Sequence, residues 1–512
     1  MPGDPLLAGI DAGTTRIRAL IFTTEGRPIA EGSRPTEVRR PRPGWAEHDA
    51  EGLWQTACGA LREALGQLDH PQRVVGVAVA SVGEAFVALD RDGRPIGPTI
   101  AWYDERPARQ LEWLSQEIGV ERLRALTGLA PDPTFSLCKL LWLKEHEPDA
   151  LARTTLWLNV AHYLAWRLCG VPGCDLSLAS RSLALDLERR RWAEDLIREL
   201  GLSPQIFAPI RPAGARLGEV TAEAAGASGL TQGCAVGVGG HDHIVGALAV
   251  RGLEPGVLFN SMGTAEALTL ALDRPGGAEL ARRGFSQGVV QVDAPIHYAF
   301  GGLPASGACI EWFRQLFASE LGHEQLIAEA EAVPPGCGGA TFLPDLRGRL
   351  SPVPDPLARG AWFGLSADAS RAVLYRAVLE GLAFDARLSL DTLTEIPGLP
   401  SIRKVRAIGG NTRNRLLMRI KRSVYGRPIA AAEMPEATAL GAALLAGLAS
   451  GVFPDLSPAA CDLSSGFRSI EPDPAWTARY EAYYREVYRP AYAALRPLHQ
   501  AARRLTDSSC RK

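Results

Sequence analysis

Four short segments of this 512-residue sequence combine residue types that could handle a phosphate group. The first is DAGTT at residues 11–15. Gly13 lets the backbone approach a phosphate closely, and the hydroxyls of Thr14 and Thr15 add hydrogen-bond donors. Asp11 could hold Mg²⁺ through water, because this ion gives up its hydration shell reluctantly. The same letters are typical of an ordinary hairpin turn, and the motif is short and common, so alone it allows either interpretation.

The second segment, SMGT at residues 261–264, repeats this chemistry without a carboxylate. Each of the two turns joins two apolar, strand-like runs, at residues 6–22 and 256–271, so each half of the chain opens with the same unit. Two such units facing each other would place backbone N–H groups and hydroxyls, including those of Gly263 and Thr264, on both sides of one cleft. The pair therefore indicates a site that holds a polyphosphate from both sides.

The third segment is HDH at residues 241–243, between a strand-like run and an apolar helix-like run at 244–250. Transfer of a phosphoryl group needs a carboxylate that accepts the proton of the attacking hydroxyl, and Asp242 is the candidate. A metal site built from His241 and His243 is the competing interpretation, but no further cluster of ligands accompanies them. Asp242 could also cap the following helix, which is compatible with the catalytic role.

The fourth segment, GGN at residues 409–411, comes at the end of a strand-like run and before a helix-like one. Gly409 and Gly410 suit a ligand whose ring or phosphate packs against backbone, although a plain strand-to-helix turn has the same composition. Trp102, near a strand end in the first half, could stack on a sugar face, whereas an aromatic residue at such a position is more often part of the core.

Hydrophobic periodicity and turn residues indicate the elements that would carry these segments. Residues 6–32 predict an antiparallel meander, and Asp49 suits the N-cap of a helix that follows it. Further elements expected are a strand at 74–81, a hairpin about Asp92 and Gly93, mainly helices over 105–200, strands at 235–240 and 404–410, and helices at 370–393 and 436–449.

Length and composition limit the class of protein. A chain of 512 residues exceeds what one hydrophobic core normally serves, so two domains are expected, with a boundary near 246–255. The net charge of −2, without a clustered basic patch, argues against a nucleic acid or a membrane surface as partner. The chain starts without the features of a signal peptide, and no run approaches the roughly 18–20 apolar residues of a spanning helix. Nine scattered cysteines are typical of a reduced, cytoplasmic protein, and the closest pair, Cys169 and Cys174, lacks the second pair that a zinc site needs.

In their order along the chain, the motifs resemble those of the FGGY carbohydrate kinases of the actin–hexokinase superfamily, from about Leu7 to Gly451. The matching segments are GIDAGTTRIRA, PGWAEHDAEGLW, DRDGRPIGPTIAWYDER, GGHDH, NSMGTAEAL, LEGLAFDAR, AIGGNTRNRLLM and EATALGAALLAG. So many ordered matches are far more specific than any single one. The resemblance implies an α/β protein in which two ribonuclease-H-like (actin/hexokinase-type) domains, at 1–247 and 248–497, flank a catalytic cleft, with a frayed tail at 498–512.

The resemblance also implies an enzyme that uses ATP and Mg²⁺ to phosphorylate a hydroxyl of a sugar or polyol. Asp242 would be the general base, and Asp11 would organise Mg²⁺ through water. The residues that would face the nucleotide are Gly13, Thr14, Thr15 and Arg18 in the first half, and Gly263, Thr264, Gly409, Gly410, Asn411 and Asn414 in the second. The residues that would contact the acceptor are Glu84, Trp102, Asp242 and His243. Many relatives are dimers, so a homodimer is a further expectation.

Three departures from the family pattern fall on the acceptor side. Xylulose-type members carry a Met-His pair where this chain has Gly83 and Glu84, and glycerol-type members carry an arginine before the glutamate. His243 stands where Asn or Gln is frequent. A buried carboxylate at Glu84 suits the hydroxyls of a neutral polyol or ketose and disfavours an acidic sugar. The sequence therefore predicts a small neutral acceptor, with a ketopentose, tetrose or tetritol ahead of hexoses.

Other interpretations stay open. A glycerol-type kinase is favoured by Arg18 and Glu84 and opposed by Gly83. A nucleotide-dependent conformational switch, or a sugar-sensing regulator without turnover, would use the same fold, although the presence of both Asp11 and Asp242 argues against lost catalysis. Release of ADP that depends on an acceptor would separate a kinase from a switch.

Overall fold

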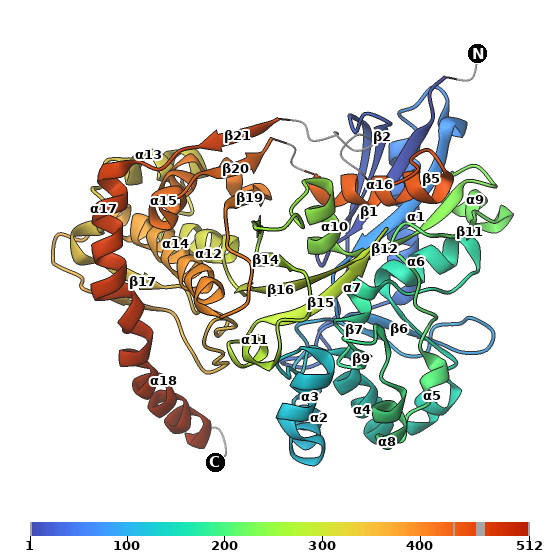
Figure 1. Cartoon of the computed structure of the whole chain (residues 1–512), viewed down its shortest axis with the longest axis horizontal. Coiled ribbons are helices and arrows are strands. Elements are labelled where there is room, and N and C mark those ends of the chain that lie inside the picture. The colour runs from blue at the N-terminus through green and yellow to red at the C-terminus, as the bar shows by residue number, and fades with distance from the viewer. Residues whose placement is uncertain (1–2, 434–435, 457–465, 510–512) are drawn as a thin grey trace.

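The computed structural model describes residues 3–433, 436–456 and 466–509, and two mixed β-sheets organise them into two halves (Figure 1). The first sheet has the order β11–β12–β5–β1–β2–β3. Its strands are β1 (Leu6–Ala12), β2 (Arg16–Thr23), β3 (Pro28–Pro35), β5 (Val74–Ser81), β11 (Arg216–Glu219) and β12 (Ala235–His241).

The second sheet repeats the central arrangement of the first, in the order β15–β16–β14–β13–β19–β20–β21. Its strands are β13 (Val257–Met262), β14 (Glu266–Leu272), β15 (Ser286–Gln291), β16 (Pro295–Leu303), β19 (Lys404–Ile408), β20 (Ile429–Ala432) and β21 (Phe467–Ile470). In both sheets an antiparallel hairpin, β1–β2 or β13–β14, lies beside a parallel neighbour, β5 or β19. This is the α/β architecture of two mixed-sheet domains that the sequence predicts.

Helices cover the sheets and extend each half. Those of the first half are α1 (Ala50–Leu65), α2 (Ala108–Leu114), α3 (Val120–Thr127), α4 (Ser136–His146), α5 (Pro148–Arg153), α6 (Val160–Cys169), α7 (Leu176–Ala179), α8 (Glu194–Glu199), α9 (Ala222–Ser228) and α10 (Asp242–Ala249). Those that follow are α11 (Ala278–Arg282), α12 (Gly307–Phe317), α13 (His323–Glu331), α14 (Arg371–Glu395), α15 (Arg415–Tyr425), α16 (Ala437–Ser450), α17 (Pro474–Tyr483) and α18 (Arg489–Ser509).

Short strands complete the fold: β4 (Glu47–His48), β6 (Phe86–Leu89), β7 (Thr99–Ile100), β8 (Leu156–Asn159), β9 (Leu185–Asp186), β10 (Arg191–Trp192), β17 (Thr341–Leu343) and β18 (Ala361–Phe363). The turn predicted about Asp92 and Gly93 forms, with the Gly93 N–H donating to the Asp90 carbonyl at 3.0 Å. The predicted hairpin closes, with the Ile96 N–H donating to the Ala88 carbonyl at 2.8 Å and an antiparallel bridge between Leu89 and Pro95, and β6 also pairs along its length with β8. The hairpin prediction is thus confirmed, and the additional pairing with β8 goes together with burial of all four residues of β6.

Most of the other predicted elements are confirmed within one or two residues. The meander is β1–β2–β3, and the Asp49 side chain caps α1 by accepting a hydrogen bond from the Gly52 N–H at 2.6 Å. The strand predicted at 74–81 is β5. At the C-terminal end, α18 continues to Ser509, so the tail expected to fray is helical over most of its length, and residues 510–512 lie outside the described residues.

Helix α16 follows strands of the second sheet in sequence but packs against the first sheet (Figure 1). Its small residues allow this close contact. A Cβ added to Gly9 of β1 would lie 1.9 Å from the Ala439 carbonyl oxygen, and one added to Gly441 would lie 2.0 Å from the Val245 oxygen of α10. A hydrophobic cluster therefore joins the two halves, because it combines residues of β1, β5, α10 and α16 with Phe259 of β13 and Ile408 of β19.

Candidate active site

The first hairpin turn carries Asp11, Thr14 and Thr15. Asp11 is next to the last residue of β1, and the two threonines lie in the turn, Thr14 half-buried and Thr15 exposed. The Gly13 N–H closes the turn on the Arg16 carbonyl at 3.0 Å. The Trp102 indole Nε1 donates to Thr14 Oγ1 at 3.1 Å, so Trp102 reaches this turn from a distant part of the chain.

Asp242 lies beside Asp11 because of the strand topology. Strands β1 and β12 both run parallel to β5, and the carboxyl ends of parallel strands meet at one edge of a sheet. Asp11 and Gly240 pair with the same residue of β5, Ala80, and Asp242 follows as the first residue of α10. The structure thus brings the two predicted carboxylates to one edge.

Burial and neighbouring negative charges raise the pKa values of both carboxyl groups. Burial and then the charge of Asp242 raise the pKa of the Asp11 carboxyl to about 7, while Arg18 opposes the shift. Burial also raises the pKa of Asp242 to about 7, against a hydrogen bond in which the His243 N–H donates to Asp242 Oδ1 at 2.6 Å. A carboxylate with a raised pKa is a stronger proton acceptor, as a general base requires.

The second hairpin turn contacts two other segments of the second half. Gly263 and Thr264 are exposed, so their backbone and hydroxyl groups are accessible. The Asn411 side-chain Nδ2 and the Gly307 N–H both donate to the Gly263 carbonyl, at 2.9 and 3.1 Å, and the Ser306 N–H donates to the Thr264 carbonyl at 2.9 Å. The start of α12 is thus part of this loop cluster, which the motif analysis missed. The Ser306-Gly307 dipeptide before an amphipathic helix is the signal that could have found it.

The glycine turn at 409–411 lies directly against the second hairpin. Gly409 has a φ of +100°, and an added Cβ would lie 2.5 Å from the Met262 carbonyl oxygen. Gly410 has open space around it and is exposed. The side chain of Asn414 caps α15, its Oδ1 accepting from the Leu417 N–H at 3.0 Å. The predicted contacts of these residues with adenosine remain a proposal.

Arg18 has a partner within the protein. Its guanidinium forms an ion pair with Glu436, the residue that precedes α16. The sequence predicts Arg18 beside the phosphates of the nucleotide, and its charge does act on Asp11. Its direct contact, however, is the carboxylate of a segment 418 positions away, which ties the first sheet to α16.

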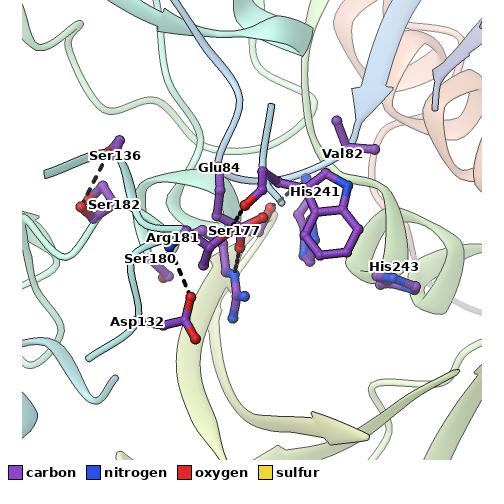
Figure 2. Close-up of polar contacts among 12 residues, drawn as sticks. Val82, Glu84, Asp132, Ser136, Ser177, Ser180, Arg181, Ser182, His241 and His243 are labelled. Carbon is purple, nitrogen blue, oxygen red and sulfur yellow. Dashed lines mark hydrogen bonds and ion pairs between the residues drawn. The ribbon is translucent and has the colours of Figure 1, made fainter. Parts of the chain in front are cut away.

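Three predicted acceptor residues, Glu84, Asp242 and His243, lie near one another on the N-terminal half, because the charge of Glu84 acts on the pKa of both others. Their surroundings are called the acceptor space, and Figure 2 shows Glu84 and His243 there. Glu84 is only 5% exposed and has a φ of +61°, a left-handed conformation that few residues other than glycine adopt. Its carboxylate forms an ion pair with Arg181, and Lys139 donates to its carbonyl. Burial, followed by the charge of Arg181, lowers the pKa of His243 to about 4, so this ring is neutral at pH 7.

Two residues of this space were missed by sequence reasoning, Arg181 and Asp132 (Figure 2). Asp132 accepts from the Thr134 N–H at 2.9 Å, and burial raises the pKa of its carboxyl. Neither residue lies in a recognisable motif, so only their position in the folded chain identifies them.

The donor set at the sheet edge suits Mg²⁺. Among the described residues no group of three or more His, Cys, Asp or Glu side chains could hold a metal ion by itself. Mg²⁺ instead is commonly held by one or two carboxylates, with water and substrate phosphates completing the octahedron. Asp11 and Asp242 supply two carboxylates whose repulsion a cation would relieve. The residues present therefore fit the group.

In the part of the chain that the structure describes, no helix is both long enough and apolar enough to cross a membrane.

Known proteins share the whole architecture. Residues 6–249 match the model for the N-terminal domain of the FGGY family of carbohydrate kinases, and residues 258–450 match the model for its C-terminal domain.

Individual relatives cover nearly the full length. The glycerol kinase of Bordetella parapertussis is 31% identical over 503 residues, with 93% of this chain and 94% of the relative covered. The xylulose kinase of Bacillus subtilis is 26% identical over 499 residues, with 96% and 98% covered. The crystal structure of xylulose kinase from Rhodospirillum rubrum superposes with a TM-score of 0.86 at 30% identity, covering 97% of this chain and all of that one.

Proposed function

The chain belongs to the FGGY family of carbohydrate kinases, and from this premise we propose that it transfers the γ-phosphate of ATP to a hydroxyl of a small neutral sugar or polyol, with Asp242 as general base. The enzyme is thus a phosphotransferase. The observation that carries the specific proposal is the meeting of Asp11 and Asp242 at one sheet edge, beside the space that Glu84 and His243 line.

Asp242 performs the proton transfer in this proposal. Its carboxylate is held by the His243 N–H at 2.6 Å, and its pKa of about 7 makes it a stronger base than an ordinary aspartate. As the acceptor hydroxyl attacks the γ-phosphorus, its proton moves to Asp242, which prevents build-up of positive charge on the attacking oxygen. The neutral ring of His243 beside it can orient the hydroxyl without repelling a metal-bound nucleotide.

The two loop clusters would hold the nucleotide. In the first half Thr14 and Thr15 supply hydroxyls, and in the second half Thr264 supplies another next to exposed backbone at Gly263. Asp11, with Asp242 nearby, would hold Mg²⁺ through water. When bound, this ion neutralises charge on the phosphate oxygens and helps to align them. The proposed adenosine contacts are at Gly409, Gly410, Asn411 and Asn414.

Closure of the two halves would exclude water, which otherwise competes with the acceptor for the phosphoryl group. Phe300 of β16 contributes to the acceptor space from the second half, because its ring lies 5.6 Å from that of His243. The acceptor space is therefore completed only when both halves are in place.

We propose a neutral ketopentose, tetrose or tetritol as acceptor. A glycerol-type kinase is the second candidate, favoured by Glu84 and by the similarity to glycerol kinases over nearly the whole chain. A nucleotide-dependent switch or a sugar-sensing regulator would bind the same ligands without acceptor-dependent turnover.

One experiment separates these candidates. Release of ADP from Mg-ATP is recorded with glycerol, tetritols, tetruloses, pentuloses, pentitols, hexoses and sugar acids, using the wild type, Asp242→Asn, and Asp195→Asn as a matched control at a fully exposed site. We expect a strong response to one neutral acceptor and a loss of kcat of about 10²- to 10⁴-fold in Asp242→Asn alone. ADP release that ignores every acceptor, or full turnover by Asp242→Asn, would contradict the proposal.

A further inference from the structure

Arg181 occupies a distinctive position in the acceptor space. It lies in the turn after α7, and its Nε donates to Glu84 Oε1 across 97 positions of sequence (Figure 2). Its guanidinium carbon lies 5.1 Å from the ring centre of Phe135 and 5.0 Å from that of Phe300. These rings come from different halves of the molecule, so the cation is held between the helical part of the first half and β16 of the second.

Gly83 lies beside both His241 and Arg181. A Cβ added to Gly83 would lie 3.3 Å from His241 Nε2 and 3.7 Å from Arg181 Cγ. A side chain at position 83 would thus press on His241 and would lie in contact with Arg181. The positive charge that pairs with Glu84 therefore comes from a separate segment, the turn after α7.

The ion pair leaves hydrogen-bonding capacity unused on both partners. Arg181 is 11% exposed, and its Nη1 is covered from solvent without a hydrogen-bond partner among the described residues. Within the same residues, the bond to Glu84 uses Oε1, and no partner is found for Oε2. A buried donor without a partner is costly, so such groups in binding sites commonly await a ligand or water.

We propose that Arg181 and Glu84 form a donor–acceptor pair that binds two neighbouring oxygen atoms of the acceptor, which makes Arg181 a specificity-determining residue for a neutral vicinal diol or α-hydroxy-ketone. Glu84 accepts a hydrogen bond from a hydroxyl, and Arg181 donates to the adjacent hydroxyl or carbonyl oxygen. The pair has no net charge, and the carboxyl groups of Asp132 and Asp242 lie nearby. A carboxylate on the acceptor is therefore disfavoured. This inference rests on the proposed kinase function.

The test uses the best acceptor of the panel and analogues that lack one oxygen, with acceptor KM, kcat and the KM for ATP measured for wild type and Arg181→Met. For glycerol the analogues are 1,2- and 1,3-propanediol, and for xylulose the analogue is 1-deoxyxylulose. We expect Arg181→Met to raise the acceptor KM about 10- to 100-fold, to change kcat and the KM for ATP less than about threefold, and to lose most discrimination against one analogue. Arg189→Met, at a 66% exposed site on the neighbouring hairpin, is the matched control.

The ratio of the KM for the analogue to the KM for the acceptor shows whether Arg181 binds the acceptor or only supports the acceptor space. If Arg181 only supported the pocket, the KM values for acceptor and analogue would rise by the same factor, and that result would overturn the inference. Arg181→Lys, which keeps the cation between the two rings, and Glu84→Gln repeat the comparison if Arg181→Met does not fold. Preference of the wild type for a sugar acid would also overturn it. A wild type without acceptor-dependent ADP release would instead refute the proposed function, since turnover by the wild type is the premise of every comparison.

Discussion

The proposed nucleotide side and the proposed acceptor side of the candidate site consist of different kinds of chemical groups. The nucleotide side consists mainly of backbone and small residues, and at Gly307 and Gly409 an added Cβ would lie within 2.6 Å of a backbone oxygen of the facing segment. The acceptor side consists of charged and aromatic side chains from distant segments, with Glu84 and Arg181 at its centre. Backbone packing leaves little freedom for change, whereas side chains can be exchanged singly. A common phosphate chemistry can therefore coexist with variable acceptors in one fold.

After the loss of kcat expected for Asp242→Asn, the next largest effect is expected at Asp11, the other carboxylate at the same sheet edge. Asp11→Asn should lower turnover on the order of 100-fold, because it removes a charge that would hold Mg²⁺ against the phosphates. It should also raise the Mg²⁺ concentration for half-maximal rate at least about tenfold. Measurement of ADP release against Mg²⁺ concentration checks this. Asp242→Asn is expected to lose more kcat with a smaller shift in Mg²⁺ demand, and equal Mg²⁺ demand in wild type and Asp11→Asn would refute the assignment.

The backbone character of the nucleotide side predicts a difference between two adjacent glycines. Gly409→Ala should lower the free energy of unfolding by about 1–3 kcal/mol, because its φ of +100° strains a residue with a Cβ and that Cβ would meet the Met262 oxygen. Gly410→Ala meets no atom within 4 Å and should change the free energy of unfolding by less than about 0.5 kcal/mol. Urea unfolding of both variants measures the difference. Equal stabilities would mean that the facing backbone can move aside.

The raised pKa of Asp242, the proposed base, predicts how kcat/KM for the acceptor depends on pH. Asp242 must be deprotonated to accept a proton, and its pKa is raised to about 7, so kcat/KM for the acceptor should fall about tenfold per pH unit below that value. The charged and titratable groups around it are Asp11, Glu84, Arg181, His241 and His243.

The negative charge of Glu84 contributes to the raised pKa of Asp242. Glu84→Gln should therefore move the acidic limb to lower pH, whatever it does to the size of kcat/KM. Full pH–rate profiles of both proteins provide the measurement. An acidic limb near pH 4 in the wild type would mean that Asp242 is not the titrating base or that bound Mg-ATP dominates its environment.

The smallest effect is expected for the hydrogen bond between Trp102 and the first hairpin turn. Trp102→Phe removes the Nε1–H bond to Thr14 Oγ1 but keeps an aromatic ring. Since such a bond contributes roughly 0.5–1.5 kcal/mol, the KM for ATP should rise roughly two- to tenfold. Trp113→Phe, at a 45% exposed site, is the control. An effect on acceptor KM alone would place Trp102 wholly on the acceptor side.

Sequence patterns predicted the parts of the fold that depend on neighbouring residues. The β1–β2–β3 meander, the cap at Asp49 and strand β5 follow from period-two hydrophobicity and turn or cap residues, which act within a few positions. The pairing of β6 with β8 was missed because about 70 residues separate the two strands and no local signal joins them.

For the candidate site, the sequence by itself determined the two Gly-Thr turns and indicated Asp11 and Asp242 as candidates, because these features depend on short motifs at strand ends. Only the tertiary structure decided that Arg181 neutralises Glu84, that Arg18 pairs with Glu436, and that Phe300 completes the acceptor space. The physical reason is distance along the chain. A glycine turn or a cap is specified by its own few residues, whereas an ion pair between positions 97 or 418 apart forms only because the packed sheets bring its partners together.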